Sequence, residues 1–231
     1  MDSYGKKCNS KFLMHYGFAI ENNREEDGKC QNEMPLVFML EDFHDEDEES
    51  AELHTRRLSH VSSKLTLRIM MHVDADSTAD ALSFCRVAVA NSLEMDEIDS
   101  RGYRGDTCVG PVSPRNEIAA LSFLAGICRQ RLTRYPTTYQ DDLYRLANDE
   151  LLQPFSNEKN ALIVIKSEKE ILHFFIQLST IATSIFSLPI DQAIRKVQRN
   201  YSDEDMRYND VARYLRIVVY DLQGDVDVSG Y

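Results

Sequence analysis

Cysteine and histidine, the residues most often used as metal ligands, nucleophiles or bases, are scattered through this sequence. Its five cysteines include no CxxC pair, and none lies near a histidine at zinc-site spacing. They are Cys8, Cys30, Cys85, Cys108 and Cys128. His15 and His173 have no neighbouring Cys, Asp or Glu pattern that suggests a ligand or a base. We therefore expect no metal, structural histidines with His15 facing solvent, and idle thiols in a reducing cytoplasmic or nuclear compartment.

A second group of residues, four of them aromatic, lies near the N-terminus. It consists of Tyr4-Gly5, Asn9-Ser10, Phe12-Leu13 and Tyr16-Gly17-Phe18, with Glu21-Asn22-Asn23 just beyond. A Tyr-Gly pair alone usually marks a turn with a packed ring. The whole arrangement, however, resembles the last motif of SET-domain methyltransferases. Within them it is most similar to the branch that contains the Rubisco large-subunit lysine methyltransferase and the actin-histidine methyltransferase.

The resemblance implies roles for three aromatic residues. Tyr4 aligns with the catalytic tyrosine that closes the methyl-transfer site, where a phenol oxygen accepts a hydrogen bond from the substrate nitrogen. Such a contact aims the nucleophile at the methyl group of S-adenosylmethionine, as an in-line displacement requires. Tyr16 aligns with a residue of the substrate channel, which favours lysine over histidine as the target. Phe18 aligns with an aromatic residue near the cofactor's adenine, although simple core packing is an equal alternative.

The later sequence carries an ordered series of motifs that resembles the substrate-binding domain following SET in this branch. They are Val112-Ser113-Pro114-Arg115-Asn116-Glu117, Leu121-Ser122-Phe123-Leu124, Tyr135-Pro136-Thr137-Thr138 with Asp141-Asp142, Asn160-Ala161-Leu162, and Lys166 to Leu172. Together with the first motif, the resemblance extends discontinuously over roughly residues 3–185. It implies a helical domain that holds a protein substrate.

Two motifs of the complete enzymes are missing from this sequence. It has no GxG segment and no Asn-His dipeptide, which the family uses to bind the cofactor. We therefore expect either a fragment or a natural module without SET. The favoured function is the substrate-recognition portion of a protein-lysine N-methyltransferase, catalytically incomplete as this chain. The alternatives are a non-catalytic helical interaction module and, less favoured, an intact small methyltransferase with an unrecognised cofactor site.

Composition narrows the class of partner. The 231 residues carry a formal net charge of −12, which argues against nucleic acids and membrane surfaces as general partners and leaves protein partners. The most apolar segment, 171–190, contains His173, Gln177 and Pro189, and fits a bundle helix better than a membrane span. The oligomeric state is left open.

The apolar patterning predicts a mainly α-helical bundle behind a small β-containing N-terminal part, which the resemblance implies is the remnant of a SET domain. Residues 1–23 form the remnant, and 24–76 a linker with strands near 36–40 and 65–71. Between the strands, Glu41 to Glu52 holds eight acidic residues in twelve positions. It is interpreted as a solvated loop, with a docking patch for a basic partner as the alternative. Residues 77–222 form the helical substrate-binding domain, and 223–231 a frayed tail.

Helix boundaries are predicted mainly from capping residues. Asn9 or Ser10 is expected to cap a short helix that Gly17 ends, and Ser113-Pro114 to start another. Thr137-Thr138 and Ser156 are expected to start the next two, the second of them running from 157 to about 186. One apolar face from Ala81 to Leu93 predicts a single helix there. Two shorter helices are expected around 191–200 and 205–222.

Overall fold

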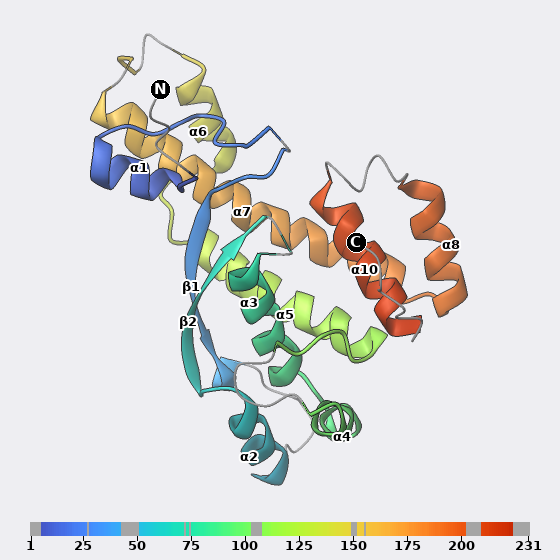
Figure 1. The fold of residues 1–231 in the computed structure, drawn as a ribbon. Helices are drawn as coiled ribbons and strands as arrows, with labels where there is room; N and C mark the ends of the chain where they lie inside the picture. The colour runs from blue at the N-terminus through green and yellow to red at the C-terminus, as the bar shows by residue number, and fades with distance from the viewer. Residues whose placement is uncertain are drawn as a thin grey trace.

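The protein is mainly α-helical with a small two-stranded sheet, as the sequence predicts (Figure 1). The computed structural model describes residues 6–26, 28–42, 51–71, 73, 75–102, 108–148, 152–154, 156–201 and 209–223. Tyr4, positions 43–50 of the acidic run and residues 224–231 of the tail lie outside these residues.

Helix α7 (Asn157–Phe186) is the central element, and α5 (Pro114–Leu132) packs along it. Both helices begin where the sequence predicts. The side chain of Ser156 accepts a hydrogen bond from the Lys159 N–H, and that of Ser113 accepts one from the Asn116 N–H. Each cap satisfies a backbone donor that the first turn of a helix leaves without a partner.

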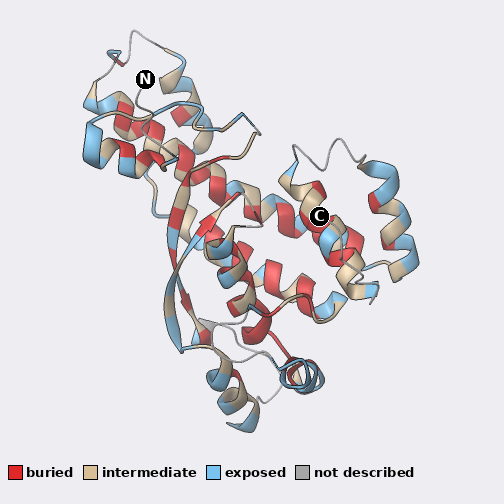
Figure 2. Ribbon diagram, viewed as in Figure 1, coloured by how far each residue is buried: buried red, intermediate tan, exposed pale blue. Residues whose placement is uncertain are grey.

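Strands β1 (Glu33–Met39) and β2 (Lys64–Met70) pair antiparallel, with Leu36 opposite Leu67. Alternate residues of β1 are buried, so one face of the sheet packs on the helices and the other faces solvent (Figure 2). Helix α3 (Asp76–Ala88) lies against β2, and α7 touches β1. The two strands expected near 36–40 and 65–71 are therefore present, and they pair with each other.

The remaining helices are arranged in pairs around this centre. Helices α1 (Asn9–Tyr16) and α6 (Tyr139–Leu146) contact the N-terminal half of α7, while α8 (Ile190–Asn200) and α10 (Asp210–Gln223) pack near its C-terminal end (Figure 1). Helices α2 (Ala51–His60) and α4 (Ser92–Ser100) pair at the far end of the sheet, beyond the 3-10 turn η1 (Leu40–Asp42).

One hydrophobic core joins the sheet to the helices. It takes residues from both strands and from α3, α5, α7, α8 and α10, among them Met34, Phe38, Ile69, Phe84, Leu121, Leu124, Phe175, Leu178, Leu215 and Val218. A smaller cluster lies between the end of α3 and α4, and includes Val87, Met95 and Ile98. The strands and the helical bundle thus share buried apolar surface, which is the main source of stability for both.

Three local features differ from the sequence-based prediction. The expected single helix from Ala81 to Leu93 is two helices, because Asn91 and Glu94 form a capping box that starts α4, and Leu93 is 79% exposed. Helix α2 was not predicted and begins within the acidic run. The N-cap of α1 is Cys8, without a side-chain capping bond, in place of the expected Asn9 or Ser10.

Candidate functional site

The structure brings Tyr16 and Phe18 together in one aromatic cluster with Phe12. The rings of Phe12 and Phe18 stack at a centroid distance of 5.3 Å, and Tyr16 lies 6.2 Å from each. The Lys7 ammonium lies 5.8 Å from the Tyr16 ring centroid. Tyr16 is 45% exposed, so its ring forms an accessible wall that could contact an aliphatic or cationic side chain. Tyr4 lies outside the described residues, and its predicted catalytic role stays a prediction.

A sharp turn after α1 carries the chain from Tyr16 to Phe18. Gly17 has φ of 76°, a left-handed conformation that glycine adopts without the steric cost of a Cβ. Its N–H bonds the Leu13 carbonyl and ends the helix, as the sequence predicts. The turn folds the chain back so that the Phe18 ring meets those of Phe12 and Tyr16.

Helix α7 holds this turn through the side chain of Asn160. The Asn160 Oδ1 accepts a hydrogen bond from the Ala19 N–H at 3.0 Å, and its Nδ2 donates to the Gly17 carbonyl at 3.2 Å. Asn160 is only 4% exposed. Both polar atoms of its amide are therefore used to fix the backbone on either side of Phe18.

Asn9 makes a second attachment between the N-terminal segment and α7. Its Oδ1 accepts from the Ile20 N–H at 2.9 Å, and its Nδ2 donates to the Ile20 carbonyl at 2.9 Å and to Ser167 Oγ at 3.2 Å. The Asn9 N–H donates to Asn32 Oδ1 at 2.9 Å, which compensates for the missing cap of α1. Asn23 closes the segment by donating to the Lys7 carbonyl at 2.8 Å.

The Tyr135 to Thr138 motif and the Lys166 to Leu172 motif meet at one buried ion pair. Lys169 Nζ lies 2.5 Å from Asp142 Oδ2 and also donates to the Thr137 carbonyl at 2.6 Å and to Thr137 Oγ1 at 2.9 Å. The Thr137 hydroxyl in turn donates to Asp142 Oδ1 at 2.7 Å. These contacts fix α6 on α7 and join the two motifs in the folded protein.

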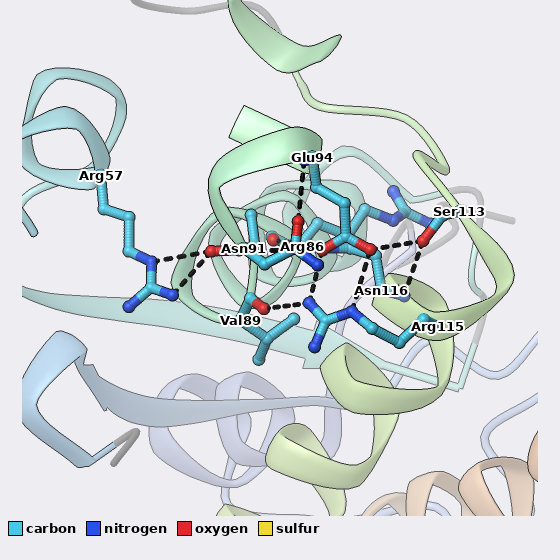
Figure 3. Close-up of polar contacts among 9 residues, drawn as sticks. Arg57, Arg86, Val89, Asn91, Glu94, Ser113, Arg115 and Asn116 are labelled. Atoms are coloured by element: carbon cyan, nitrogen blue, oxygen red, sulfur yellow. Dashed lines mark hydrogen bonds and ion pairs between the residues drawn. The ribbon is translucent and has the colours of Figure 1, made fainter. Parts of the chain in front are cut away.

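The Ser113 to Glu117 motif lies in a second polar network that joins α3, α4 and α5 (Figure 3). Glu94 accepts hydrogen bonds from the Ser113 hydroxyl at 2.5 Å and from Arg115 Nε at 3.0 Å. Asn116 Nδ2 donates to the Arg86 carbonyl at 2.9 Å. Arg57 of α2 reaches the same end of α3 and donates to the Ala90 carbonyl at 2.6 Å.

Glu117, at the end of this motif, is fully buried and joins three helices. Arg86 of α3 donates to both of its carboxylate oxygens at 2.9 Å, and the Tyr214 hydroxyl of α10 donates to one of them. Burial disfavours the charge of Arg86, but the adjacent Glu117 carboxylate outweighs that effect and raises the pKa of the guanidinium. These charges are paired and hydrogen-bonded, as buried ionised groups must be.

A surface pocket of about 380 Å³ lies between α7 and α10, apart from the aromatic cluster. Its wall includes Phe174 and Ile181 of α7, Asp210 of α10 and Arg24 of the N-terminal segment. The sequence gives no signal for this pocket, because its residues come from segments that are far apart along the chain. In the part of the chain that is described, no group of three or more His, Cys, Asp or Glu residues could hold a metal.

The histidines and cysteines lie much as expected. His15 is exposed, and His173 is an exposed residue of α7 whose ring lies 5.6 Å from that of Tyr139. All five cysteines are free, and four of them are buried; Cys108 is the exposed one. Across the described ranges, no helix combines the length and apolar character needed to cross a membrane.

Comparison with known protein families matches residues 46–172 to the family described as Rubisco LSMT substrate-binding. No curated protein matches the chain. The matched stretch contains Glu94, Ser113 to Glu117, Asp142 and Lys169, and so covers most of both buried polar networks. It also spans more than half of the 231 residues. The chain therefore belongs to the Rubisco LSMT substrate-binding family.

Proposed function

We propose that this chain is the substrate-recognition portion of a SET-type protein-lysine N-methyltransferase, and that it is catalytically incomplete by itself. The observation that carries the proposal is the attachment of residues 7–23 to the N-terminal part of α7, which the family match includes. Asn160 and Ser167 of α7 bind the segment that holds Tyr16 and Phe18. The substrate-binding helices and the proposed end of a methyl-transfer channel thus form one connected unit.

The described residues near Tyr16 do not fit S-adenosylmethionine as a complete pocket. Phe18 and Phe12 offer an aromatic surface against which an adenine could pack. The amino-acid and ribose parts of the cofactor need free hydrogen-bonding groups, whereas the side-chain donors and acceptors of Asn9 and Asn160 already bind the protein backbone. A SET segment would have to supply those groups.

In this proposal the substrate is a protein with an accessible lysine. Tyr16 lies at the surface with its ring 45% exposed, where it could line the path of an extended side chain. The formal net charge of −12 suits a neutral or basic protein better than a nucleic acid.

The test joins the SET core of a lysine methyltransferase ahead of Tyr4 and measures transfer of labelled methyl groups to candidate proteins. We expect activity from the joined protein, none from the chain alone, and a fall on the order of 10² to 10³ for Tyr4→Phe in the joined protein. Micromolar binding of S-adenosylmethionine by the isolated chain in calorimetry would contradict the proposal. A joined protein that binds its partner without methylating it would favour the non-catalytic interaction module.

A further inference from the structure

We propose that Asn160 of α7 is a positioning residue for the methyl-transfer channel, because it sets the backbone that carries Tyr16 and Phe18. The catalytic part of this inference rests on the proposed function. Its structural part concerns the position of residues 16–20 and can be tested without measuring methyl transfer. It assigns to the substrate-binding helix a direct effect on the geometry of the channel wall.

The first step is the geometry of the contact between the Asn160 side chain and the turn. One amide group, that of Asn160, binds the Gly17 carbonyl and the Ala19 N–H, the two backbone groups that bracket Phe18. A primary amide carries a donor and an acceptor in one plane, so it can satisfy both groups at once. A side chain with only a donor or only an acceptor could hold one of them but not the other.

The second step is that α7 holds the same turn at two points. Asn160 binds at Gly17 and Ala19, and Ser167 binds the Asn9 amide that is paired with Ile20. Positions 160 and 167 are about two helical turns apart and lie on one face of α7. The two attachments therefore fix the position of the turn along α7, and the turn cannot shift along the helix axis without breaking both.

The third step is that the turn is only partly buried and lies outside the main hydrophobic core. Tyr16 is 45% and Ile20 is 38% exposed, while Phe18 and Ala19 are only partly buried. The Asn160 hydrogen bonds hold this turn together with the Phe12–Phe18 stack, and losing them moves the turn without removing a large part of the core. Displacement of a channel group by about 1 Å can cost on the order of 10² in rate.

Three variants of the full chain separate positioning from general stability. Asn160→Ala removes both contacts, whereas Asn160→Asp keeps the acceptor for the Ala19 N–H and loses the donor to the Gly17 carbonyl. Thr137→Val is the matched control. It removes a hydroxyl that Lys169 and Asp142 contact on another face of α7, and so weakens the fold without touching residues 16–20.

The measurement is amide hydrogen exchange at Ala19, together with the resonance of 3-fluorotyrosine placed at position 16. In Asn160→Ala we expect about tenfold faster exchange at Ala19, the effect of losing one net hydrogen bond, and a shifted fluorine resonance. Asn160→Asp should keep the slow exchange at Ala19. Thr137→Val should lower the melting temperature yet leave both signals as in the wild type. Unchanged exchange in Asn160→Ala, or an equal rise in Thr137→Val, would overturn the inference.

The catalytic arm uses the protein joined to a SET core. We expect Asn160→Ala to lower kcat roughly 10- to 100-fold with little change in KM for the protein substrate, and Thr137→Val to leave both near wild type. A wild-type kcat in Asn160→Ala would refute the positioning role even if Ala19 exchanges faster. If the joined wild-type protein is inactive, the proposed function fails, and the exchange measurement decides the structural part by itself.

Discussion

Lys169 of α7 and Asp142 of α6 form an ion pair of 2.5 Å whose side chains are 1% and 0% exposed. The ammonium group also binds Thr137 and lies 5.1 Å from the centroid of the Tyr135 ring. A buried pair of this kind is stabilising only when its remaining donors and acceptors are satisfied, and here they are bonded to the same Thr137. The pair therefore depends on the whole Tyr135 to Thr138 motif.

Removing Lys169 should destabilise the fold strongly. Lys169→Ala leaves the buried Asp142 carboxylate without its counter-ion, and we expect a loss of about 3–5 kcal/mol in the free energy of unfolding. Urea denaturation at neutral pH measures it. The double variant Lys169→Met with Asp142→Leu removes both charges and should recover much of the loss. A cost below about 1 kcal/mol for Lys169→Ala, the range of an exposed pair, would contradict the burial of this ion pair.

Glu94 should make the protein sensitive to acid. Burial alone would raise its pKa, but hydrogen bonds from Arg115, Ser113 and the Asn91 N–H hold the pKa below its usual value. A carboxyl whose pKa is lower in the folded state contributes stability above its unfolded pKa of about 4.3 and loses it as the pH falls through the folded pKa.

Melting temperatures measured between about pH 6 and pH 3 test this dependence. We expect Glu94→Gln to melt lower than the wild type near neutral pH and to lose less stability on acidification. Glu97→Gln is the control, because Glu97 lies on the same helix with its side chain 49% exposed. If the acid dependence of Glu94→Gln matched that of the wild type, the assigned role of Glu94 would be wrong.

Tyr214 should fix α10 to the rest of the bundle. Its hydroxyl donates to the buried Glu117, so Tyr214→Phe leaves one carboxylate oxygen with the Arg86 bond alone. We expect a loss of about 1–3 kcal/mol. Faster amide exchange should be concentrated in α10. Tyr220→Phe, which removes only an exposed contact with Gln198, should change neither property; equal effects of the two variants would argue against the buried bond.

Cys108 should be the first thiol to react with iodoacetamide in the native protein. The residue is exposed, but partial burial of its thiol and the hydrogen bond to Asp80 raise the pKa of the thiol to about 11. Because only the thiolate reacts, labelling should be slow at pH 8 and should become faster as the pH rises toward the pKa. Asp80→Asn removes the neighbouring negative charge and should speed the reaction. Mass spectrometry of peptides that contain each cysteine measures the order; prior labelling of Cys85 or Cys128 would contradict the packing of α3 on α5.

The parts of the fold that local chemistry determines could be predicted from the sequence. Ser113, Thr138 and Ser156 are helix caps because a short polar side chain before an apolar repeat satisfies the first free N–H groups. The pairing of Tyr16 with Phe18 is also local, since only Gly17 separates them. The break between α3 and α4 is marked by the capping box of Asn91 and Glu94, whereas the apolar spacing up to Leu93 by itself predicts one continuous helix.

The contacts that position the candidate site could not be predicted in this way. Asn160 binds Ala19 across 141 positions of sequence. Lys169 lies among charged residues, a pattern typical of a solvent-exposed helix face, yet its ammonium group is buried. Nothing local distinguishes an asparagine or lysine that faces solvent from one that meets a distant partner, because that choice depends on how the helices pack.

The 30-residue length of α7 restricts how this chain can change by insertion or deletion. Its N-terminal half presents Asn160, Ser167 and Lys169 to the N-terminal segment and α6, while its C-terminal half presents Phe175 and Leu178 to the core. Adding one residue between these halves would rotate one set against the other by about 100°, since a helix has about 3.6 residues per turn. Either the polar attachments or the core would then face the wrong way. The number of residues between Lys169 and Phe175 is thus fixed by geometry, whatever side chains fill the exposed positions.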